Sequence, residues 1–334
     1  MMNREISTCG GPYFDELERG QYFDNAPALT LTPGIAAMHR AIIGDRMRLA
    51  LDEGLSVRVT QEHAQTVSPA LTWDVAIGQS TLATQRVKAN LFYRGLAFHR
   101  FPVMGDTLFT RTEVVSLREN SRRPGRKPTG MAVLRVITRD QQDRRVLDFY
   151  RCAMLPISPD AVEIGRQDDW SETAVAPIRD DPTRNWDAQA FRARVGGPHF
   201  ATSLEGAVLR STGDVVSSAP ELARLTLNIA AVHHDSRAGG QRLVYGGHTI
   251  GLALAQATRL LPNLATVLSW RSCDHTGPVY EGDTLYSVLS IESATALPEE
   301  RGGTLDLRSL VYAEDPDARA DRKVLDWRFT GLMF

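Results

Sequence analysis

Hydrophobic and polar positions in the first half of the chain follow a pattern that predicts two helices followed by strands. Thr32 and Ser68 each precede a proline, which is typical of a helix start, because the hydroxyl caps a free amide and proline fits the first turn. The second helix is expected from about Leu71 to Lys88. Runs rich in Val, Leu, Phe, Tyr and Thr then predict strands at residues 90–103, 107–118 and 131–154, the last as a hairpin that turns at residues 140–143.

The second half repeats this order of elements. Ser218 is expected to cap a helix that has Pro220 in its first turn, and Gly246 to begin a long apolar helix that ends near Leu261, before Pro262. Strands are expected at residues 266–279, 284–293, 304–312 and 324–334. A long helix followed by antiparallel strands, without alternation of strands and helices, predicts an α+β fold in which a curved sheet wraps a helix.

Two short sequence motifs each occur twice, and the two copies of each are separated by nearly the same number of residues. Residues 102–108 (PVMGDTL) return as 278–285 (PVYEGDTL), and residues 146–149 (VLDF) return as 324–327 (VLDW). Their first residues are 176 (278 − 102) and 178 (324 − 146) positions apart, which indicates that a whole domain is duplicated. A helix wrapped by a sheet, present twice, is the outline of a double hotdog fold. We expect an N-terminal hotdog at residues 1–157, a polar, proline-containing linker at 158–183 and a C-terminal hotdog at 184–334.

Composition narrows the class of protein without identifying it. The chain has 334 residues, 43% of them hydrophobic and 23% charged, and a net charge of −2. These values are ordinary for a globular protein and give no electrostatic argument for binding nucleic acid or an anionic membrane. The longest apolar runs are shorter than the roughly 18–20 residues of a membrane span, and the first seven residues lack the apolar region of a signal peptide.

The cysteines and glycines argue against a metal centre or a bound cofactor. Three scattered cysteines without CxxC spacing favour a reducing compartment, so we expect a cytoplasmic protein without a disulfide framework or a zinc site. No cluster of His, Asp or Cys has the spacing of metal ligands. The glycine pairs also lack the GxGxxG context of a dinucleotide site. No metal and no cofactor are therefore expected.

Candidate catalytic residues are concentrated in the second half. His233 follows Asn228 by five positions, and residues 245–248 read Tyr-Gly-Gly-His at the start of the long helix. The corresponding stretch of the first half keeps Asp45 but has Ala50 at the histidine position. We interpret the chain as a duplicated fold with one working site, in which the first half shapes the pocket and does not catalyse.

These residues resemble a known family. The (Asp or Asn)-x4-His motif at Asn228 and His233, the turn at 245–248 and the Gly-Asp-Thr strand entry at 282–284 are similar to MaoC-like (R)-specific enoyl-CoA hydratases, in which the motif lies just before the hotdog helix. The particular residues, Asn in the first motif and Tyr-Gly-Gly-His in the second, resemble most the mesaconyl-CoA hydratase (β-methylmalyl-CoA dehydratase) branch. Residues 102–120 of the first half support the same resemblance, which therefore covers most of the chain.

The resemblance implies a hydro-lyase that adds water to a 2-enoyl-CoA thioester or removes it from a 3-hydroxyacyl-CoA thioester. Hydration requires a water activated for attack on C3, a proton at C2 and stabilisation of the thioester oxygen. We expect His233 to be the base, because histidine titrates near neutral pH, and Asn228 to orient the water or the imidazole. The amides of Gly246 or Gly247 would face the thioester oxygen from a helix N-terminus.

The roles of several neighbouring residues stay open. Tyr245 either contacts substrate or packs in the core, and His248 either lines the pocket or faces the neighbouring sheet. His275 and Arg271, on a predicted strand, are candidates for contact with the acyl group or a phosphate.

Two alternative functions and the quaternary state also stay open. The better-known form of the motif has Asp where this chain has Asn228, and an amide takes up no proton, so a non-catalytic acyl-CoA-binding protein is one alternative. The other is a thioesterase, although the helix from Gly246 to Leu261 contains no Asp or Glu to activate water. Two fused units already form a pseudo-dimer, and a further homodimer is compatible with the sequence.

Overall fold

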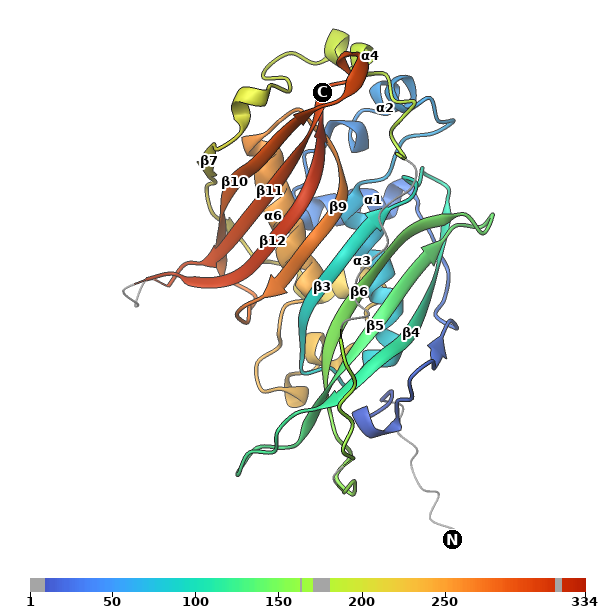
Figure 1. Cartoon of the computed structure of the whole chain (residues 1–334), viewed down its shortest axis with the longest axis vertical. Helices are drawn as coiled ribbons and strands as arrows, with labels where there is room; N and C mark the ends of the chain where they lie inside the picture. Colours follow the sequence, from blue (N-terminus) through green and yellow to red (C-terminus); the bar gives the residue numbers. More distant parts are fainter. Residues whose placement is uncertain (1–9, 163, 171–180, 316–319) are drawn as a thin grey trace.

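The computed structural model describes residues 10–162, 164–170, 181–315 and 320–334. Figure 1 shows a continuous curved sheet in front of two long helices, α3 (Pro69–Gln79) and α6 (Gly246–Leu260), which contact each other. The sheet has twelve strands, and the two halves join where β3 (Ala89–Phe98) pairs antiparallel with β9 (Leu264–His275). This architecture confirms the predicted α+β double hotdog fold.

Two short strands, a helix, a long helix and four long strands follow one another in both halves. The first half contains the helices α1 (Pro33–Ile43), α2 (Glu53–Thr60) and α3 and the strands β1 (Tyr22–Phe23), β2 (Leu29–Thr30), β3, β4 (Thr107–Glu119), β5 (Thr129–Arg139) and β6 (Arg145–Pro156). The second half contains the helices α4 (Ala188–Arg194), α5 (Ala219–Leu225) and α6 and the strands β7 (Val208–Arg210), β8 (Asp214–Val215), β9, β10 (Thr284–Ala296), β11 (Gly303–Ala313) and β12 (Arg322–Met333). An additional helix, α2, lies between α1 and α3 of the first half only, whereas α4 precedes the short strands of the second. The order along the sheet is β1-β4-β5-β6-β3-β9-β12-β11-β10-β7, with β2 beside β4 and β8 beside β10.

A buried glutamine repeats the same hydrogen bonds in both halves. Gln79 of α3 donates to a carbonyl of β4 (3.0 Å) and accepts from the Thr110 hydroxyl (2.6 Å). Gln256 of α6 donates to a carbonyl of β10 (2.8 Å) and accepts from the Ser287 hydroxyl (2.5 Å). The members of each pair lie 177 positions apart (256 − 79 and 287 − 110). The duplication therefore extends to the polar contacts that hold each helix on its sheet.

One predicted helix boundary is wrong. α3 ends at Gln79 instead of near Lys88, and the chain continues as a 3-10 helix over Ser80–Thr84. The hydroxyls of Ser80 and Thr81 donate to carbonyls three residues earlier (2.6 and 2.5 Å). Such bonds compete with the helical pattern, and they explain why apolar periodicity alone overestimates the length of this helix.

The expected cap of α5 is also wrong in detail. Ser218 occupies the position before the helix, but its side chain makes no capping bond and its φ of 57° is left-handed. The first helical amide, of Ala219, donates instead to the carboxylate of Glu281 (3.2 Å). A carboxylate from another segment thus replaces the local hydroxyl at this positive helix end.

The expected linker at 158–183 lies partly outside the described residues, which omit 163 and 171–180. Its described part comes after β6 in the chain and lies beside the end of β4. There the Glu119 carboxylate accepts from the amides of Ile164 and Gly165 (2.9 Å each). Of the three cysteines, Cys9 lies outside the described residues, whereas Cys152 and Cys273 are buried free thiols.

Three tryptophans join the two halves in one core. Trp73 of α3 lies with its ring centroid 4.8 Å from that of Trp270 on β9 and 6.1 Å from that of Trp327 on β12, both in edge-on geometry. All three side chains are fully buried. Because the cluster takes one ring from the first half and two from the second, the halves share a hydrophobic core and are not independent domains.

Replacing Trp73 by alanine is therefore expected to lower the free energy of unfolding by about 3–5 kcal/mol, as for other large aromatic side chains in cores. Urea unfolding followed by circular dichroism measures this loss. Phe109→Ala on β4 is the matched control, because Phe109 is 48% exposed, and its change should be small. Equal losses in the two variants would contradict a shared core at Trp73.

Candidate active site

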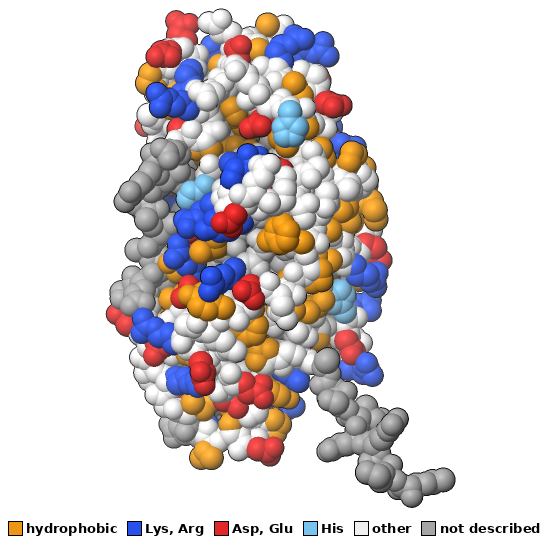
Figure 2. Space-filling model, turned by 90° about the vertical axis from the view of Figure 1, so that its right-hand side faces the viewer, with side chains coloured by type: hydrophobic (Ala, Val, Ile, Leu, Met, Phe, Trp, Pro, Cys, Tyr) orange, Lys and Arg blue, Asp and Glu red, His pale blue; other side chains and the backbone are white. Residues whose placement is uncertain are grey.

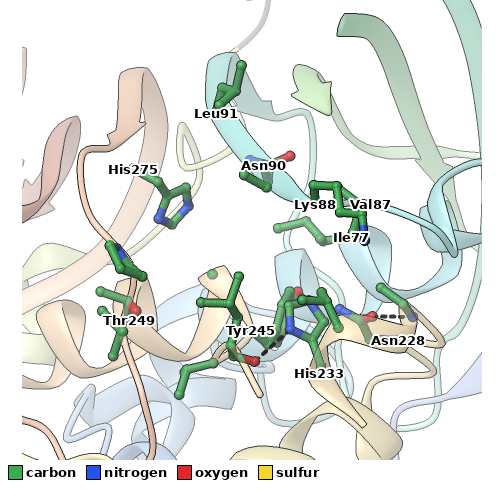
Figure 3. A pocket seen from close by; sticks show the side chains of 18 of the residues that line it. Ile77, Val87, Lys88, Asn90, Leu91, Asn228, His233, Tyr245, Thr249 and His275 are labelled. Carbon is green, nitrogen blue, oxygen red and sulfur yellow. Dashed lines mark hydrogen bonds between the residues drawn. The ribbon is translucent and has the colours of Figure 1, made fainter. Parts of the chain in front are cut away.

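A cavity of about 290 Å³ lies between the two halves and brings together several of the residues that the sequence singles out. Asn228, His233, Tyr245 and Gly246 line it from the second half. Figure 3 shows His233 beside Tyr245 on one side of the cavity, with Asn90 and His275 on another. Gly247, His248 and Arg271 are not among the residues that line it.

Asn228 is held in place by backbone contacts on both sides. Its Oδ1 accepts from the amide of Ala230 (3.0 Å), and its carbonyl accepts from Nε2 of His234 (2.7 Å). The preceding residue, Leu227, has a left-handed φ of 61°. The side-chain nitrogen Nδ2 of Asn228 has no hydrogen-bond partner among the described residues, and Asn228 lines the cavity. Its NH₂ group is therefore available to a ligand or a water.

A glycine of the first half makes room for this loop. Gly78 of α3 lies so close to the loop that a Cβ at this position would be 1.7 Å from the carbonyl oxygen of Thr226. The hydroxyl of Thr81 then accepts from the amide of Ile229 (3.1 Å). α3 thus positions Asn228, although the two belong to different halves of the chain.

His233 is fixed in one tautomer. It ends the 3-10 helix Ala231–His233, and its Nδ1 lies 2.9 Å from the carbonyl of Leu243. Since a carbonyl only accepts, Nδ1 carries the proton and Nε2 keeps its lone pair. Burial lowers the pKa of His233 to about 4, so the ring is neutral at physiological pH. Nε2 is therefore a free base in the cavity wall.

Gly246 begins α6 and lines the cavity beside these groups. The first amides of a helix have no partner within the helix and point toward its positive end, which favours negative charge on a ligand. The imidazole of His275 lies directly against this glycine, because a Cβ on Gly246 would be 2.8 Å from its Cε1 and Nε2. His275, a secondary candidate from the sequence, is thus part of the cavity wall.

Gly247 and His248 do not line the cavity. A Cβ on Gly247 would lie 2.0 Å from Oδ1 of Asp74, a fully buried residue of α3 that also bonds His39 of α1 (2.9 Å). His248 is buried, and neither of its ring nitrogens has a hydrogen-bond partner among the described residues. Burial and the nearby His39 lower the pKa of His248 to about 4. The structure therefore places Gly247 against α3 and His248 in the interior, near His39 of α1.

Tyr245 serves both the cavity and the core. Its ring lines the cavity with its centroid 5.8 Å from that of His233. Its hydroxyl donates to the backbone carbonyl of Asp74 (3.1 Å) and is buried. Of the two roles that the sequence left open, packing therefore accounts for the hydroxyl, and only the ring faces the cavity.

The first half keeps the bond from the motif side chain to the backbone but has no cavity of comparable size. Oδ1 of Asp45 accepts from the amide of Met47 (2.9 Å), in the same way as Asn228 with Ala230, and its Oδ2 accepts from Ser68 (2.5 Å). The cavity beside Asp45 and Ala50 measures about 20 Å³. A space of this size has no room for an acyl thioester, and an alanine stands where the second half has its histidine.

The first half instead supplies one wall of the working cavity. Asn90 and Tyr93 of β3 and Arg151 of β6 line it, and none of these was singled out from the sequence. Both polar atoms of the Asn90 side chain are buried without a hydrogen-bond partner among the described residues. The sequence signal for Arg151 is the alternation of β6, which puts it on the same face as Phe149 and Ala153.

Metal ligands and membrane spans add no second type of site among the described residues. In the view of Figure 2, acidic and basic side chains are interspersed over the face. Within the described ranges, no group of three or more His, Cys, Asp or Glu side chains is arranged to hold a metal ion. Over the same residues, no helix has the length and apolarity of a membrane span.

The fold and the cavity define a double hotdog protein with one site shared between its halves. No family model matches the chain. Its sequence is 65% identical to that of Rv0216 from Mycobacterium tuberculosis, a conserved hypothetical protein with a double hotdog fold. The two structures superpose with a TM-score of 0.93 over 97% of this chain and 99% of that one.

Two proteins of Chloroflexus aurantiacus connect this fold to an activity. β-Methylmalyl-CoA dehydratase is 28% identical over 98% of both chains. The structure of a MaoC domain protein dehydratase is 25% identical, with a TM-score of 0.80 over 98% of this chain and 99% of that one. The chain belongs to the MaoC-like hydratase/dehydratase family, as its motif predicts.

The buried histidines make the stability depend on pH. His233, His248 and His275 have pKa values of about 4 in the folded protein, against 6.5 in the unfolded chain. Between these values the unfolded chain binds more protons, so stability is complete above pH 6.5 and decreases as the pH falls toward 4. Each histidine contributes a slope of up to about 1.4 kcal/mol per pH unit.

His248→Leu should therefore reduce the slope of the unfolding free energy against pH, between pH 6.5 and pH 4.5, by up to about 1.4 kcal/mol per pH unit. Urea unfolding at several pH values measures it. His63→Leu is the control, because the His63 side chain is 77% exposed. An unchanged slope in His248→Leu would show that folding does not lower the pKa of His248.

Proposed function

We propose that this protein is a hydro-lyase that adds water to a 2-enoyl-CoA thioester, or removes it from a 3-hydroxyacyl-CoA thioester. The observation that carries the proposal is the free Nε2 of His233, held by the bond from Nδ1 to Leu243 in a cavity that also contains Asn228 and the first turn of α6. Membership of the MaoC-like family, in which relatives are named as CoA-thioester dehydratases, supports it.

In the proposed reaction His233 carries out both proton-transfer steps. Nε2 removes a proton from water as the water oxygen bonds to C3, and the electrons of the double bond move to the thioester as an enolate. The amide of Gly246 or Gly247 at the N-terminus of α6 stabilises the enolate oxygen. His233 then returns the proton to C2, so that the elements of one water are added and the base is regenerated.

Asn228 orients the water in this scheme. Its Oδ1 is occupied by the amide of Ala230, so the free NH₂ group is the part that can donate to the water oxygen. Unlike a carboxylic acid, the amide of Asn228 cannot act as an acid or a base. His233 alone therefore accepts and donates the proton.

The two alternative functions, a thioesterase and a non-catalytic binding protein, differ in their support. A thioesterase needs a carboxylate or another nucleophile at the thioester, and the nearest acidic candidate, Asp74, is fully buried against His39 and does not line the cavity. A non-catalytic acyl-CoA-binding protein keeps one supporting observation, which is Asn228 in place of an acid. Turnover by the wild-type protein separates it from the hydro-lyase.

The first test is hydration of crotonyl-CoA, longer-chain enoyl-CoA and mesaconyl-CoA, followed by loss of absorbance of the conjugated thioester. His233→Ala should lower kcat by about 10²–10⁴-fold, the usual contribution of a general base. His63→Ala is the control, because it removes an exposed histidine far from the motif in sequence. CoA-ester binding without turnover in wild type would favour the binding protein instead.

Asn228→Ala should lower kcat by about tenfold to a hundredfold with little change in KM, because the water loses its orientation but not its base. Asn228→Asp should keep the loop intact, since Asp45 makes the same bond to a backbone amide in the first half. Steady-state kinetics of both variants would show this, and full activity in Asn228→Ala would remove Asn228 from the mechanism.

A further inference from the structure

A second cavity, of about 420 Å³, lies at the other end of α6 from the catalytic motif. It is lined by residues of α2 and α4, which lie beside each other (Figure 1), and by Thr258 and Pro262 at the end of α6. Gly246, which lines the cavity of His233, begins the same helix twelve residues before Thr258. At 1.5 Å per residue the two positions are about 18 Å apart. The two cavities share no lining residue.

Arginines dominate the polar lining of this second cavity. Arg46 and Arg48 come from the first half, and Arg194 comes from the end of α4 in the second half. Asp52 is the one acidic residue among the residues that line the cavity. Three guanidinium groups and one carboxylate give the lining a formal charge of +2 (3 − 1). A concave surface that carries one sign of charge attracts ions of the other sign.

Two of these arginines stand on the segment of the first half that corresponds to the catalytic motif. The two copies of the motif are 183 residues apart (228 − 45), so Arg46 and Arg48 occupy the positions of Ile229 and Ala231. Arg48 and Ala231 each begin a 3-10 helix of three residues, so the two segments share a local conformation. The first half thus lacks the histidine of the motif but carries two positive charges that the second half lacks.

Arg48 is held in place by neutral groups. Its Nε donates to the carbonyl of Pro262 (3.0 Å) and to Oδ1 of Asn263 (3.2 Å). Nδ2 of Asn263 in turn donates to the carbonyls of Gly196 and Pro198, just after α4 (3.3 and 2.9 Å). These bonds fix the guanidinium and leave its charge uncompensated. Its two terminal nitrogens have no partner among the described residues and are available to an anion.

The other two arginines are compensated weakly or not at all. Arg46 is exposed and makes no hydrogen bond or ion pair with another described residue. Arg194 lies 3.4 Å from Oδ2 of Asp52, and the two side chains are 62% and 38% exposed. A solvent-exposed pair of this kind stabilises a protein little. An anion that enters the cavity therefore does not have to replace a strong internal partner of any of the three guanidinium groups.

Aliphatic side chains line the same cavity. Leu51, Leu55 and Val195 stand beside the arginines, and Leu51 is 44% exposed although it is large and apolar. Guanidinium groups bind phosphate oxygens with two parallel hydrogen bonds and also stack on planar rings. A volume of about 420 Å³ is in the range of small-molecule sites. Positive charge next to apolar surface suits a ligand with phosphates on a planar, weakly polar body.

We propose that this cavity is a second ligand site, which binds a nucleoside diphosphate or triphosphate. The phosphates lie between the three arginines, and the base lies against Leu51, Leu55 and Val195. The inference does not depend on the proposed hydration, because the two cavities have no residue in common. Since the arginines come from both halves, a bound nucleotide joins the halves at the end of α6 and stabilises the folded protein.

Titration calorimetry with ADP at low ionic strength tests the site. Wild type should bind one ADP per chain. Arg46→Gln and Arg194→Gln should each raise Kd at least tenfold, the effect of losing one charge-assisted hydrogen bond, and the double variant should bind no ADP. Both side chains are exposed, so the variants should fold normally. Arg58→Gln is the matched control, because Arg58 is exposed on α2 but does not line the cavity.

Two partial ligands test the chemical class. Adenosine lacks the phosphates and inorganic pyrophosphate lacks the base, so each should bind at least tenfold more weakly than ADP. Saturating ADP should raise the melting temperature of wild type and leave that of the double variant unchanged. Lys88→Met tests the location, because Lys88 lines the cavity of His233, where the nucleotide part of a CoA ester is an alternative source of ADP binding. This variant should bind ADP as wild type does.

Four outcomes would overturn the proposal. One is a wild-type protein that binds no ADP at millimolar concentration, a result that needs no variant. Another is ADP binding that survives in the double arginine variant. A third is binding that is lost in Lys88→Met instead, which would place ADP at the cavity of His233. The fourth is pyrophosphate that binds as tightly as ADP, which would leave no role for the base. None of these results bears on whether an enoyl-CoA is hydrated.

Discussion

The close contact between α3 of the first half and two segments of the second half is the constraint on which the site depends. The loop before Asn228 approaches α3 so closely that only glycine fits at position 78. The start of α6 approaches the same helix at Gly247, where a side chain would meet Asp74. Because the loop that carries Asn228 and the N-terminus of α6 are both packed against α3, the second half cannot form its site alone.

This dependence explains how a duplicated fold comes to have one cavity. The polar contacts that attach each long helix to its sheet are the same in both halves, as the pairs Gln79–Thr110 and Gln256–Ser287 show. The halves differ where a ligand would bind. On one side Asp45 bonds the cap of α3 and an alanine replaces the histidine, whereas on the other side the corresponding space is open and lined by both halves.

The fold could be predicted from the sequence because its signals are local or repeated. Thr32 caps α1 as expected, with its hydroxyl 3.3 Å from the amide of Ile35. The duplicated motifs mark corresponding strands in the two halves. The motif likewise identifies Asn228 and His233, since their spacing lies within one segment. The end of α3 could not be predicted, because it depends on hydroxyl contacts that apolar periodicity does not register.

The wall opposite the motif could not be predicted for a different reason. Arg151 and Asn90 belong to the half without the histidine, and each reaches the cavity only through the pairing of β3 with β6 and β9. An arginine in a strand of ordinary composition is usually exposed or paired with a carboxylate. Its inward position follows from the alternation of β6, but the absence of a partner follows only from three-dimensional contacts.

The electrostatics of the cavity connect the two halves in a further way. A neutral histidine and an uncompensated arginine share one poorly hydrated space, and the positive charge of Arg151 is one of the causes that hold the pKa of His233 near 4. A base with so low a pKa is weak at physiological pH. Negative charge on a bound ligand would offset the charge of Arg151 and raise the pKa of His233 toward the range in which a general base is effective. In the proposed scheme, a residue of the first half therefore influences the strength of the base of the second.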